Sequence, residues 1–331
     1  MRQIRCGVIG LGIGEAHAAS CVNNPGAHLQ KICDFDHEKA RNLAKKYNCR
    51  IAAHADDIIN DPEIDLVIIA SYDSYHFEQA GRAIANGKDV YIEKPAVCTA
   101  DQAKQLRGLI KKHSRSISSN LVLRTCPLFQ NLKEEIQSGS FKDVYYIQAA
   151  YLWGRVYKIL DGWRKEDPGY SIIAGAAVHL VDLICWLTGK LPDRVSACGN
   201  RLATGGKTHF DDFAALRLNF PDGLIAEITV HGGCAHPHFH ELRMYGSEKT
   251  FYHDLSGSRW INLKGEISNE ASEYPAKNLR HLALDSFIGH LADKTAPAMI
   301  TADDMFNSLS VCLAAERSLK QNNESIHINY Y

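Results

Sequence analysis

The first third of the chain alternates short apolar runs with stretches of helical composition. The apolar runs cover residues 4–9, 29–33, 65–70, 90–92 and 118–122. Helical composition occurs at residues 15–20, 77–86 and 100–112, and Gly87 ends the second of these stretches. This alternation is typical of a parallel sheet with right-handed helical crossovers. Residues 1–122 are therefore predicted to form a doubly wound α/β domain.

The pattern changes after residue 124. One helical stretch, 127–138, precedes segments 144–152, 213–220, 224–230 and 242–245, in which apolar and polar residues alternate. A period of two indicates strands with one solvated face, so we expect a large and mainly antiparallel sheet. Helical stretches at 278–294 and 302–320 complete a predicted α+β domain over residues 123–331. Two domains also fit the length, because 331 residues exceed the usual size of one hydrophobic core.

Composition narrows the range of functions. The chain has 37 Lys and Arg against 38 Asp and Glu, with no long run of either sign. This balance argues against nucleic acid or a membrane as a partner and favours a small-molecule ligand. Ten scattered cysteines without a Cys-x-x-Cys pair indicate thiols in a reducing cytoplasm. No apolar stretch approaches the roughly 18 residues that cross a bilayer.

A glycine turn joins the first predicted strand to the first helix, and it reads Gly10-Leu11-Gly12-Ile13-Gly14. Glycines let the backbone approach a pyrophosphate, whose charge the N–H groups and the helix N-terminus offset. The second strand ends at Asp34, where a carboxylate can bind a ribose diol, as in a Rossmann domain. Asp34 and Asp36 would repel a 2′-phosphate, so NAD is preferred over NADP. The alternative is that Asp34 caps the helix beginning near residue 37.

Lys94 is the best catalytic candidate in the chain. It follows strand 90–92 and Glu93, and it precedes Pro95. Doubly wound proteins bind ligands at the carboxyl ends of their parallel strands, which is where Lys94 stands. Burial beside a cationic cofactor lowers the pKa of a lysine towards the range useful for proton transfer.

The apolar helical stretch 173–187 carries His179 and Asp182. A spacing of three places both side chains on one helical face. Together they can hold a substrate hydroxyl and relay its proton. The alternative is a structural His–Asp pair at a domain interface.

Three histidines, His236, His238 and His240, would share one face of a strand. That geometry suits zinc or copper, but no cysteine or carboxylate stands at a convincing spacing. We therefore predict no metal site and favour polar strand residues that face a ligand.

A stretch rich in aromatic and guanidinium groups follows segment 144–152. Its members are Tyr151, Trp153, Arg155, Trp163 and Arg164. Such groups can stack on a sugar face and hold an anionic substituent. The alternative is strand packing followed by a solvated loop.

The combination resembles the glucose-fructose oxidoreductase and inositol dehydrogenase (Gfo/Idh/MocA) family over nearly the whole chain. The matching pieces, in order, are Gly10-Leu11-Gly12, His17, Asp34, Glu93-Lys94-Pro95 and His179-Leu180-Val181-Asp182. The resemblance implies a nicotinamide-dependent dehydrogenase of a sugar, polyol or nucleotide-linked sugar. It also implies that the second domain has an open-faced sheet, binds substrate and builds a homodimer or homotetramer.

The resemblance also implies roles for individual residues. Lys94 would be the main acid/base, preceded by Glu93 near the nicotinamide and followed by a cis bond to Pro95, while His179 and Asp182 would lie on the substrate side. The expected cofactor contacts are Gly10, Gly12, Ile13, Gly14, Asp34, Ser71, Tyr72, His76, Glu93 and Lys94. The expected substrate contacts are Lys94, Tyr151, Arg155, Trp163, Arg164, His179 and Asp182.

Three positions depart from the family pattern. Gly14 stands one residue before the usual third glycine, so a shorter pyrophosphate loop is expected. Tyr72-Asp73 replaces the usual Pro-Asn, and Asp73 would bring negative charge towards the cofactor. Gly175, four residues before His179, stands where sugar and inositol dehydrogenases often carry Asp. Lys94 is then expected to carry more of the proton transfer, with His179 as its helper.

We therefore expect an NAD-dependent enzyme that oxidises a secondary alcohol of a sugar or polyol. Hydride would pass to C4 of nicotinamide while Lys94 receives the hydroxyl proton. Two alternatives stay open. One is a dihydrodiol dehydrogenase or biliverdin-reductase-like enzyme on the same fold, and the other is a sensor that binds NAD(H) without turnover.

Overall fold

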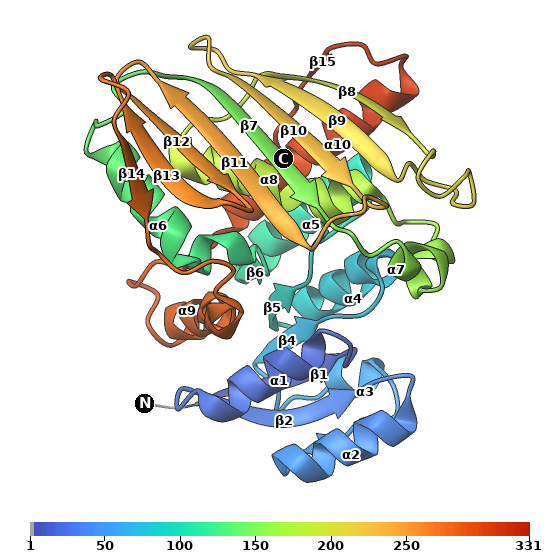
Figure 1. Cartoon of the computed structure of the whole chain (residues 1–331). Helices are drawn as coiled ribbons and strands as arrows, with labels where there is room; N and C mark the ends of the chain where they lie inside the picture. Colours follow the sequence, from blue (N-terminus) through green and yellow to red (C-terminus); the bar gives the residue numbers. More distant parts are fainter. Residues whose placement is uncertain (1–2) are drawn as a thin grey trace. The chain divides into compact units, whose positions relative to one another are not determined.

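The computed structural model describes residues 3–331, which form two compact units (Figure 1). The first unit contains the chain up to Val122 together with Asn278–Met305. The second contains Leu123–Lys277 and Phe306–Tyr330. The predicted second domain, residues 123–331, included the segment 278–305, which in the structure packs within the first unit.

A six-stranded parallel sheet forms the centre of the first unit, in the order β3-β2-β1-β4-β5-β6. Its strands are β1 (Ile4–Ile9), β2 (Ala27–Cys33), β3 (Arg50–Ile51), β4 (Leu66–Ile69), β5 (Asp89–Ile92) and β6 (Ile117–Ser119). Its helices are α1 (Gly14–Asn23), α2 (His37–Tyr47), α3 (Asp56–Ile59), α4 (Asp73–Ala85), α5 (Ala100–His113) and α9 (Leu282–Ala292). The strand order reverses between β1 and β4, and ligands of such sheets bind at this switch point.

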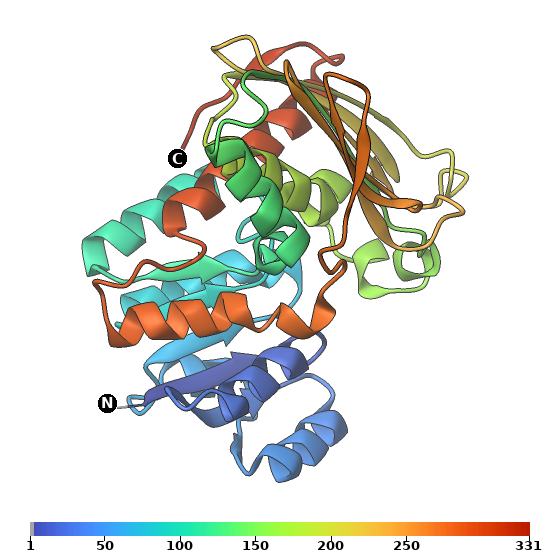
Figure 2. The same ribbon diagram turned by 60° about the vertical axis from the view of Figure 1, so that its left-hand side comes forward.

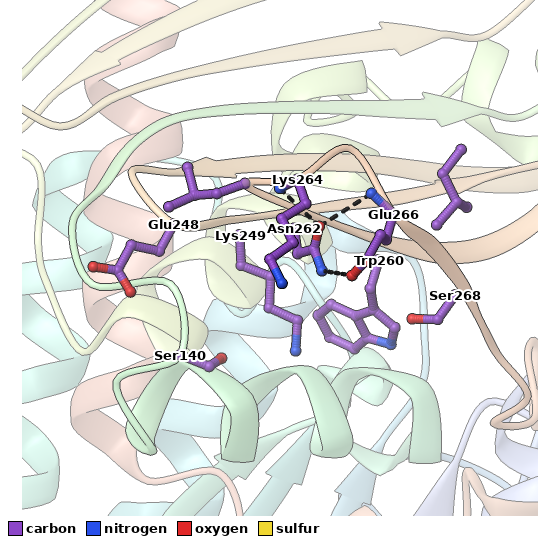
Figure 3. Close-up of a pocket in the computed structure, with 10 residues that line it drawn as sticks. Ser140, Glu248, Lys249, Trp260, Asn262, Lys264, Glu266 and Ser268 are labelled. Atoms are coloured by element: carbon purple, nitrogen blue, oxygen red, sulfur yellow. Dashed lines mark hydrogen bonds between the residues drawn. The ribbon is translucent and has the colours of Figure 1, made fainter.

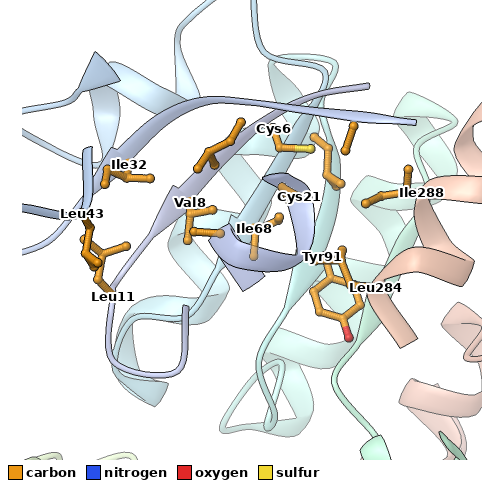
Figure 4. Close-up of a cluster of buried hydrophobic side chains, with 14 of the residues drawn as sticks. Cys6, Val8, Leu11, Cys21, Ile32, Leu43, Ile68, Tyr91, Leu284 and Ile288 are labelled. Carbon is orange, nitrogen blue, oxygen red and sulfur yellow. The ribbon is translucent and has the colours of Figure 1, made fainter. Parts of the chain in front are cut away.

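Apolar side chains on both faces of β1 and β4 explain why these strands are central. All four residues of β4 are buried, and so are the last four of β1. Figure 4 shows how Val8, Ile68 and Tyr91 join Leu284 and Ile288 of α9 in one cluster. Helix α9 belongs to the first unit because its apolar face completes this core.

The second unit contains a nine-stranded sheet in the order β14-β13-β12-β11-β7-β10-β9-β8-β15. Its strands are β7 (Val144–Leu152), β8 (Arg194–Asn200), β9 (Phe213–Asn219), β10 (Ile225–His231), β11 (Phe239–Gly246), β12 (Lys249–Asp254), β13 (Gly257–Asn262), β14 (Ile267–Glu270) and β15 (Ile326–His327). Its helices are α6 (Pro127–Gln137), α7 (Tyr157–Leu160), α8 (Val178–Thr188) and α10 (Ala302–Lys320), the last of which begins in the first unit. Strands β10 and β7 pair in parallel, and the other neighbours are antiparallel.

One face of this sheet is covered and the other is open. Helices α6, α8 and α10 lie against one face, while no helix of the described chain covers the opposite face (Figures 1 and 2). The burial of β10 alternates residue by residue, as a strand with one solvated face requires. The predicted fold class, a Rossmann domain followed by an α+β domain with an open-faced sheet, is confirmed.

Local differences from the predicted elements are small. The predicted helix 173–187 is a π-helix at Ile173–Ala177 that continues as α8. Helix α4 begins at Asp73, four residues before the predicted start, because the Tyr72 backbone is still extended. Strand β6 ends at Ser119, and a 3-10 helix follows at Val122–Thr125. Among residues 3–331, no helix has both the length and the apolarity that a membrane crossing requires.

Candidate active site

The glycine turn after β1 has the geometry that a pyrophosphate requires. Gly10 has φ +84°, and a Cβ there would lie 2.4 Å from the carbonyl oxygen of Ala70. A Cβ on Gly12 would meet no atom within 4 Å, so this backbone stays open to a ligand. Gly14 begins α1, and its Cβ position is 3.1 Å from Val8 and Ala70, so this glycine brings helix and sheet close together. The turn therefore fits a dinucleotide.

Asp34 lies at the end of β2 and faces the same turn. Its carboxylate accepts the N–H of Leu11 at 2.5 Å and the N–H of Asp36 at 2.8 Å. Carboxylate oxygens have further lone pairs, so Asp34 can still accept from a ribose diol. The interpretation of Asp34 as a helix cap was wrong, since Asp36 caps α2 by accepting the N–H of Lys39 at 2.9 Å.

In the loop after β4, two of the predicted cofactor contacts, Ser71 and His76, are hydrogen-bonded to other groups of the protein. His76 is fully buried, with its ring nitrogens 2.7 Å from the Pro95 carbonyl oxygen and 3.1 Å from that of Ser71. His76 therefore joins two loops from within the core instead of facing a cofactor. The Ser71 hydroxyl donates to Gln79 at 2.7 Å. Asp73, which was expected to bring negative charge towards the cofactor, is also buried.

Tyr72 belongs to a group of three exposed aromatic rings. Phe35, directly after Asp34, is 75% exposed, while Tyr72 and Tyr75 are 40% and 44% exposed. The three ring centroids lie 6.2 to 6.4 Å apart. Three large apolar rings are thus available to a ligand beside the carboxylate of Asp34.

Glu93 is held in a buried hydrogen-bond network directly before Lys94. One carboxylate oxygen lies 2.9 Å from His17 Nε2 and 2.6 Å from Asn120 Nδ2, and the Tyr91 hydroxyl donates to Asn120 at 3.1 Å. Desolvation acts to raise the pKa of Glu93, but the bonds from His17 and Asn120 and the charge of Lys94 outweigh it and lower the pKa. Glu93 is therefore ionised.

The peptide bond between Lys94 and Pro95 is cis, which confirms what the family resemblance implied. The Lys94 side chain is half-buried at the carboxyl end of β5. Its neighbour Glu93 fixes the backbone from which it extends. Asn120 was not identified from the sequence, although it follows β6 by one residue, as ligand-side groups of a parallel sheet often do.

In the second unit, His179 lies within a cluster of aromatic and imidazole rings. Its ring centroid is 6.2 Å from that of Tyr151 and 6.4 Å from that of His240. Tyr151 stacks on His240 at 4.4 Å, because antiparallel pairing sets these two residues directly opposite each other on β7 and β11. The Tyr151 hydroxyl lies 2.9 Å from His238 Nε2.

The three histidines His236, His238 and His240 do not all lie together in the structure. His238 and His240 join the cluster, whereas His236 bonds the carbonyl of Pro237. The Tyr274 hydroxyl accepts the backbone N–H of His240 at 2.8 Å and lies 2.7 Å from His240 Nδ1. Within residues 3–331 no group of His, Cys, Asp or Glu has the arrangement of a metal site. Tyr274 was not identified from the sequence.

Asp182 is part of a buried ion pair. Arg124 donates to its two carboxylate oxygens from Nε at 2.9 Å and Nη2 at 2.6 Å, and the Ser308 hydroxyl lies at 3.4 Å. The side chains of Arg124 and Asp182 expose only 4% and 1% of their surface. Direct contact with a substrate hydroxyl is therefore not available to Asp182 in this structure, because its carboxylate is covered and already bound by Arg124.

Two members of the predicted aromatic and guanidinium group, Trp153 and Trp163, lie around Arg164, together with Tyr170. The guanidinium carbon lies 5.1 Å from the ring centroid of Trp153, 4.5 Å from Trp163 and 5.6 Å from Tyr170. Tyr170 also explains Gly175, because a Cβ at that glycine would lie 2.9 Å from the Tyr170 ring and 3.3 Å from its hydroxyl. The space that a side chain at position 175 would need is thus filled by a phenol ring.

An open pocket of about 610 Å³ lies elsewhere in the second unit (Figure 3). Its lining includes Lys249 of β12, Trp260 of β13 and Glu266 of the turn between β13 and β14, and none of the described residues that line it is a candidate named above. Lys249 is already held by an ion pair to Glu135 and lies over the Trp260 ring. The pocket is therefore separate from the candidate residues around Lys94 and from those around His179.

The comparisons with known proteins agree with the geometry. The family model described as "Oxidoreductase family, NAD-binding Rossmann fold" matches residues 4–121, and the "GFO/IDH/MocA C-terminal domain" model matches residues 129–252. The scyllo-inositol 2-dehydrogenase (NAD(+)) of Bacillus subtilis is 30% identical over 258 residues, which cover 76% of this chain and 73% of that protein. The chain belongs to the Gfo/Idh/MocA oxidoreductase family.

Solved structures share the fold of this Gfo/Idh/MocA protein over its whole length. A myo-inositol 2-dehydrogenase from Lactobacillus plantarum superposes with a TM-score of 0.84 at 21% identity, covering 99% of this chain and 100% of the other. Levoglucosan dehydrogenase in complex with NADH has a TM-score of 0.85 at 18% identity, covering 100% of both chains. The first unit is accordingly the NAD-binding domain of an oxidoreductase.

Proposed function

We propose that this protein oxidises a secondary alcohol on the ring of a polyol or sugar and uses NAD as the hydride acceptor. The observation that supports this best is the cluster of His179, His238, His240 and Tyr151, because imidazole and phenol groups bind vicinal hydroxyls. The inositol and levoglucosan dehydrogenases among the similar proteins support the same substrate class.

The first unit would hold the cofactor and receive the proton. Bound NAD supplies a hydride acceptor at C4 of its nicotinamide. The glycine turn would bind the pyrophosphate, Asp34 the adenosine ribose, and the rings of Phe35, Tyr72 and Tyr75 the adjoining adenine. The carboxylate of Asp34 would also exclude a 2′-phosphate, which favours NAD over NADP.

Lys94 would accept the substrate hydroxyl proton. The ionised Glu93 beside it is fixed by His17 and Asn120, so Glu93 orients the loop and supplies a compensating negative charge. In the second unit, His179 would bind the reacting hydroxyl or its neighbour, with Tyr151 and His240 forming the adjoining wall. Asp182 would act as a positioning residue that holds α8 through Arg124.

Cytoplasmic location and a homodimer or homotetramer are part of the same proposal. Residues 3–331 include all ten cysteines, and no disulfide joins them, which fits a reducing compartment. The open face of the large sheet offers a surface for self-association. A dihydrodiol dehydrogenase or biliverdin-reductase-like enzyme, and an NAD(H) sensor without turnover, are the alternatives that a test must separate.

The test is NADH formation, followed at its absorbance, with the purified protein and a panel of inositols, aldoses, anhydrosugars, sugar acids and sugar phosphates. We expect turnover of at least one cyclic polyol or sugar. A dihydrodiol and biliverdin (with NADH) complete the panel, and preferred turnover of either would contradict the proposal. NADH binding without turnover of any compound would instead identify a sensor.

A further inference from the structure

We propose that the substrate of this enzyme carries an anionic group, a carboxylate or a phosphate, that Arg155 and Arg164 bind. The inference rests on the proposed function and narrows its substrate class. It distinguishes this chain from an enzyme whose substrate is a neutral polyol.

The segment after β7 contains both signs of charge, with four cations (Arg155, Lys158, Arg164 and Lys165) and three carboxylates (Asp161, Glu166 and Asp167). Arg155, Lys158 and Arg164 lie within ten residues, and no carboxylate of residues 3–331 forms an ion pair with any of the three. Burial, and then the charges of Arg155 and Arg164, lower the pKa of Lys158, so both guanidinium groups are close enough to repel this lysine. An anion bound among them would relieve that repulsion.

Aromatic rings hold the Arg164 guanidinium. Trp163, Trp153 and Tyr170 surround it at 4.5 to 5.6 Å, an arrangement that stabilises a cation without using its N–H groups. Those donors stay available for a carboxylate or phosphate, which arginine binds in a bidentate manner. A guanidinium oriented in this way loses less entropy when it binds an anion.

Two structural connections join Arg164 to the His179 cluster. Trp153 continues the pairing of β7 through its N–H bond to His231, and it lies two residues after Tyr151, so both side chains point to the same face of the sheet. Tyr170 contacts both Arg164 and Gly175, which precedes His179 by four residues. Trp153, which contacts Arg164, is thus about 7 Å along the strand from Tyr151 of the cluster proposed to bind the reacting hydroxyl.

The experiment compares matched neutral and anionic sugars: glucose with glucuronate and glucose 6-phosphate, and myo-inositol with an inositol monophosphate. The wild-type kcat/KM should be higher for an anionic member than for its neutral partner. In Arg164→Gln and in Arg155→Gln this preference should fall about tenfold or more, because a charge-assisted hydrogen bond is lost. Lys165→Gln, an exposed lysine of the same loop, is the matched control and should keep the preference.

Glucuronate and glucose 6-phosphate separate carboxylate from phosphate as the recognised group. Equal kcat/KM for neutral and anionic partners, or a preference that survives both arginine substitutions, would overturn the inference while leaving the proposed function intact. If neither these compounds nor any compound of the wider panel is oxidised, the proposed function fails. The inference is then tested by binding, which is followed by the tryptophan fluorescence of the NADH complex. Saturable binding of an anionic member that Arg164→Gln abolishes supports it, and absence of such binding contradicts it.

Discussion

Arg124 and Asp182 meet in the interior of the second unit, where both charges are removed from water. Such a pair is tolerated because the guanidinium binds both carboxylate oxygens, at 2.9 and 2.6 Å. Removing one partner leaves the other charge buried and uncompensated. His179 lies one turn earlier on the same helix, so the ion pair fixes the helix that carries it.

The substitution Asp182→Asn tests whether Asp182 positions α8 or takes part in catalysis. It should lower the free energy of unfolding by about 3 kcal/mol, because Arg124 loses its counter-charge. The kcat of the folded fraction should fall far less than in His179→Gln. Urea unfolding and steady-state kinetics on the same preparations measure both effects.

A double variant, Arg124→Met with Asp182→Leu, provides the control, since apolar residues of similar volume often replace a buried ion pair without loss of stability. It should recover much of the stability lost in Asp182→Asn. A stable Asp182→Asn protein whose turnover has fallen by powers of ten would instead assign Asp182 to the catalytic groups.

Strand pairing brings together Tyr151 and His240 of the cluster that is proposed to bind the substrate. The same sheet also buries His253 between aromatic rings. His253 of β12 is buried between Phe239, stacked at 4.8 Å, and the edge of Tyr274 at 4.3 Å, and its Nδ1 lies 2.8 Å from the Ser258 hydroxyl. Desolvation lowers the pKa of His253 to about 4, and the charge of Asp254 only partly opposes this. His253 is therefore neutral in the folded strand at physiological pH.

Because His253 is buried, we expect the stability of the folded protein to fall as the pH is lowered. Between pH 6.5 and about 4 the unfolded chain binds a proton at His253 that the folded chain does not, so stability rises with pH across that window. His253 should make the protein about 2 kcal/mol less stable at pH 5 than at pH 7.5. In His253→Gln, the difference between urea unfolding at these two pH values should shrink by that amount. An unchanged difference would show that His253 does not titrate in this way.

Across the whole molecule, the features that were predicted correctly are those that depend on residues close together in the chain. Apolar spacing predicted β1, β7 and α10, and the glycine turn with Asp34 indicated a dinucleotide, because these patterns depend on neighbouring residues. Strand register is not local. Only the pairing of β7 with β11 sets His240 opposite Tyr151 and draws Tyr274 into the cluster.

Tertiary partners far apart in the chain could not be predicted for the same reason. Arg124 pairs with Asp182 across 58 residues, and Glu93 with His17 across 76. Neither apolar pattern nor spacing indicates which buried charge meets which. The sequence also could not assign α9 to the first unit, since its amphipathic pattern fits the core of either unit equally well.

Lys94 is proposed to receive the proton of a substrate hydroxyl in an NAD-dependent oxidation. The most direct measurement is kcat of Lys94→Ala with the best alcohol of the panel, together with the affinity of the variant for NADH. We expect kcat to fall by about 10² to 10⁴ while the Kd for NADH changes little, because Lys94 acts on the substrate proton and the glycine turn and Asp34 bind the cofactor. Near-normal turnover in Lys94→Ala would contradict the role of Lys94 as the group that receives the hydroxyl proton.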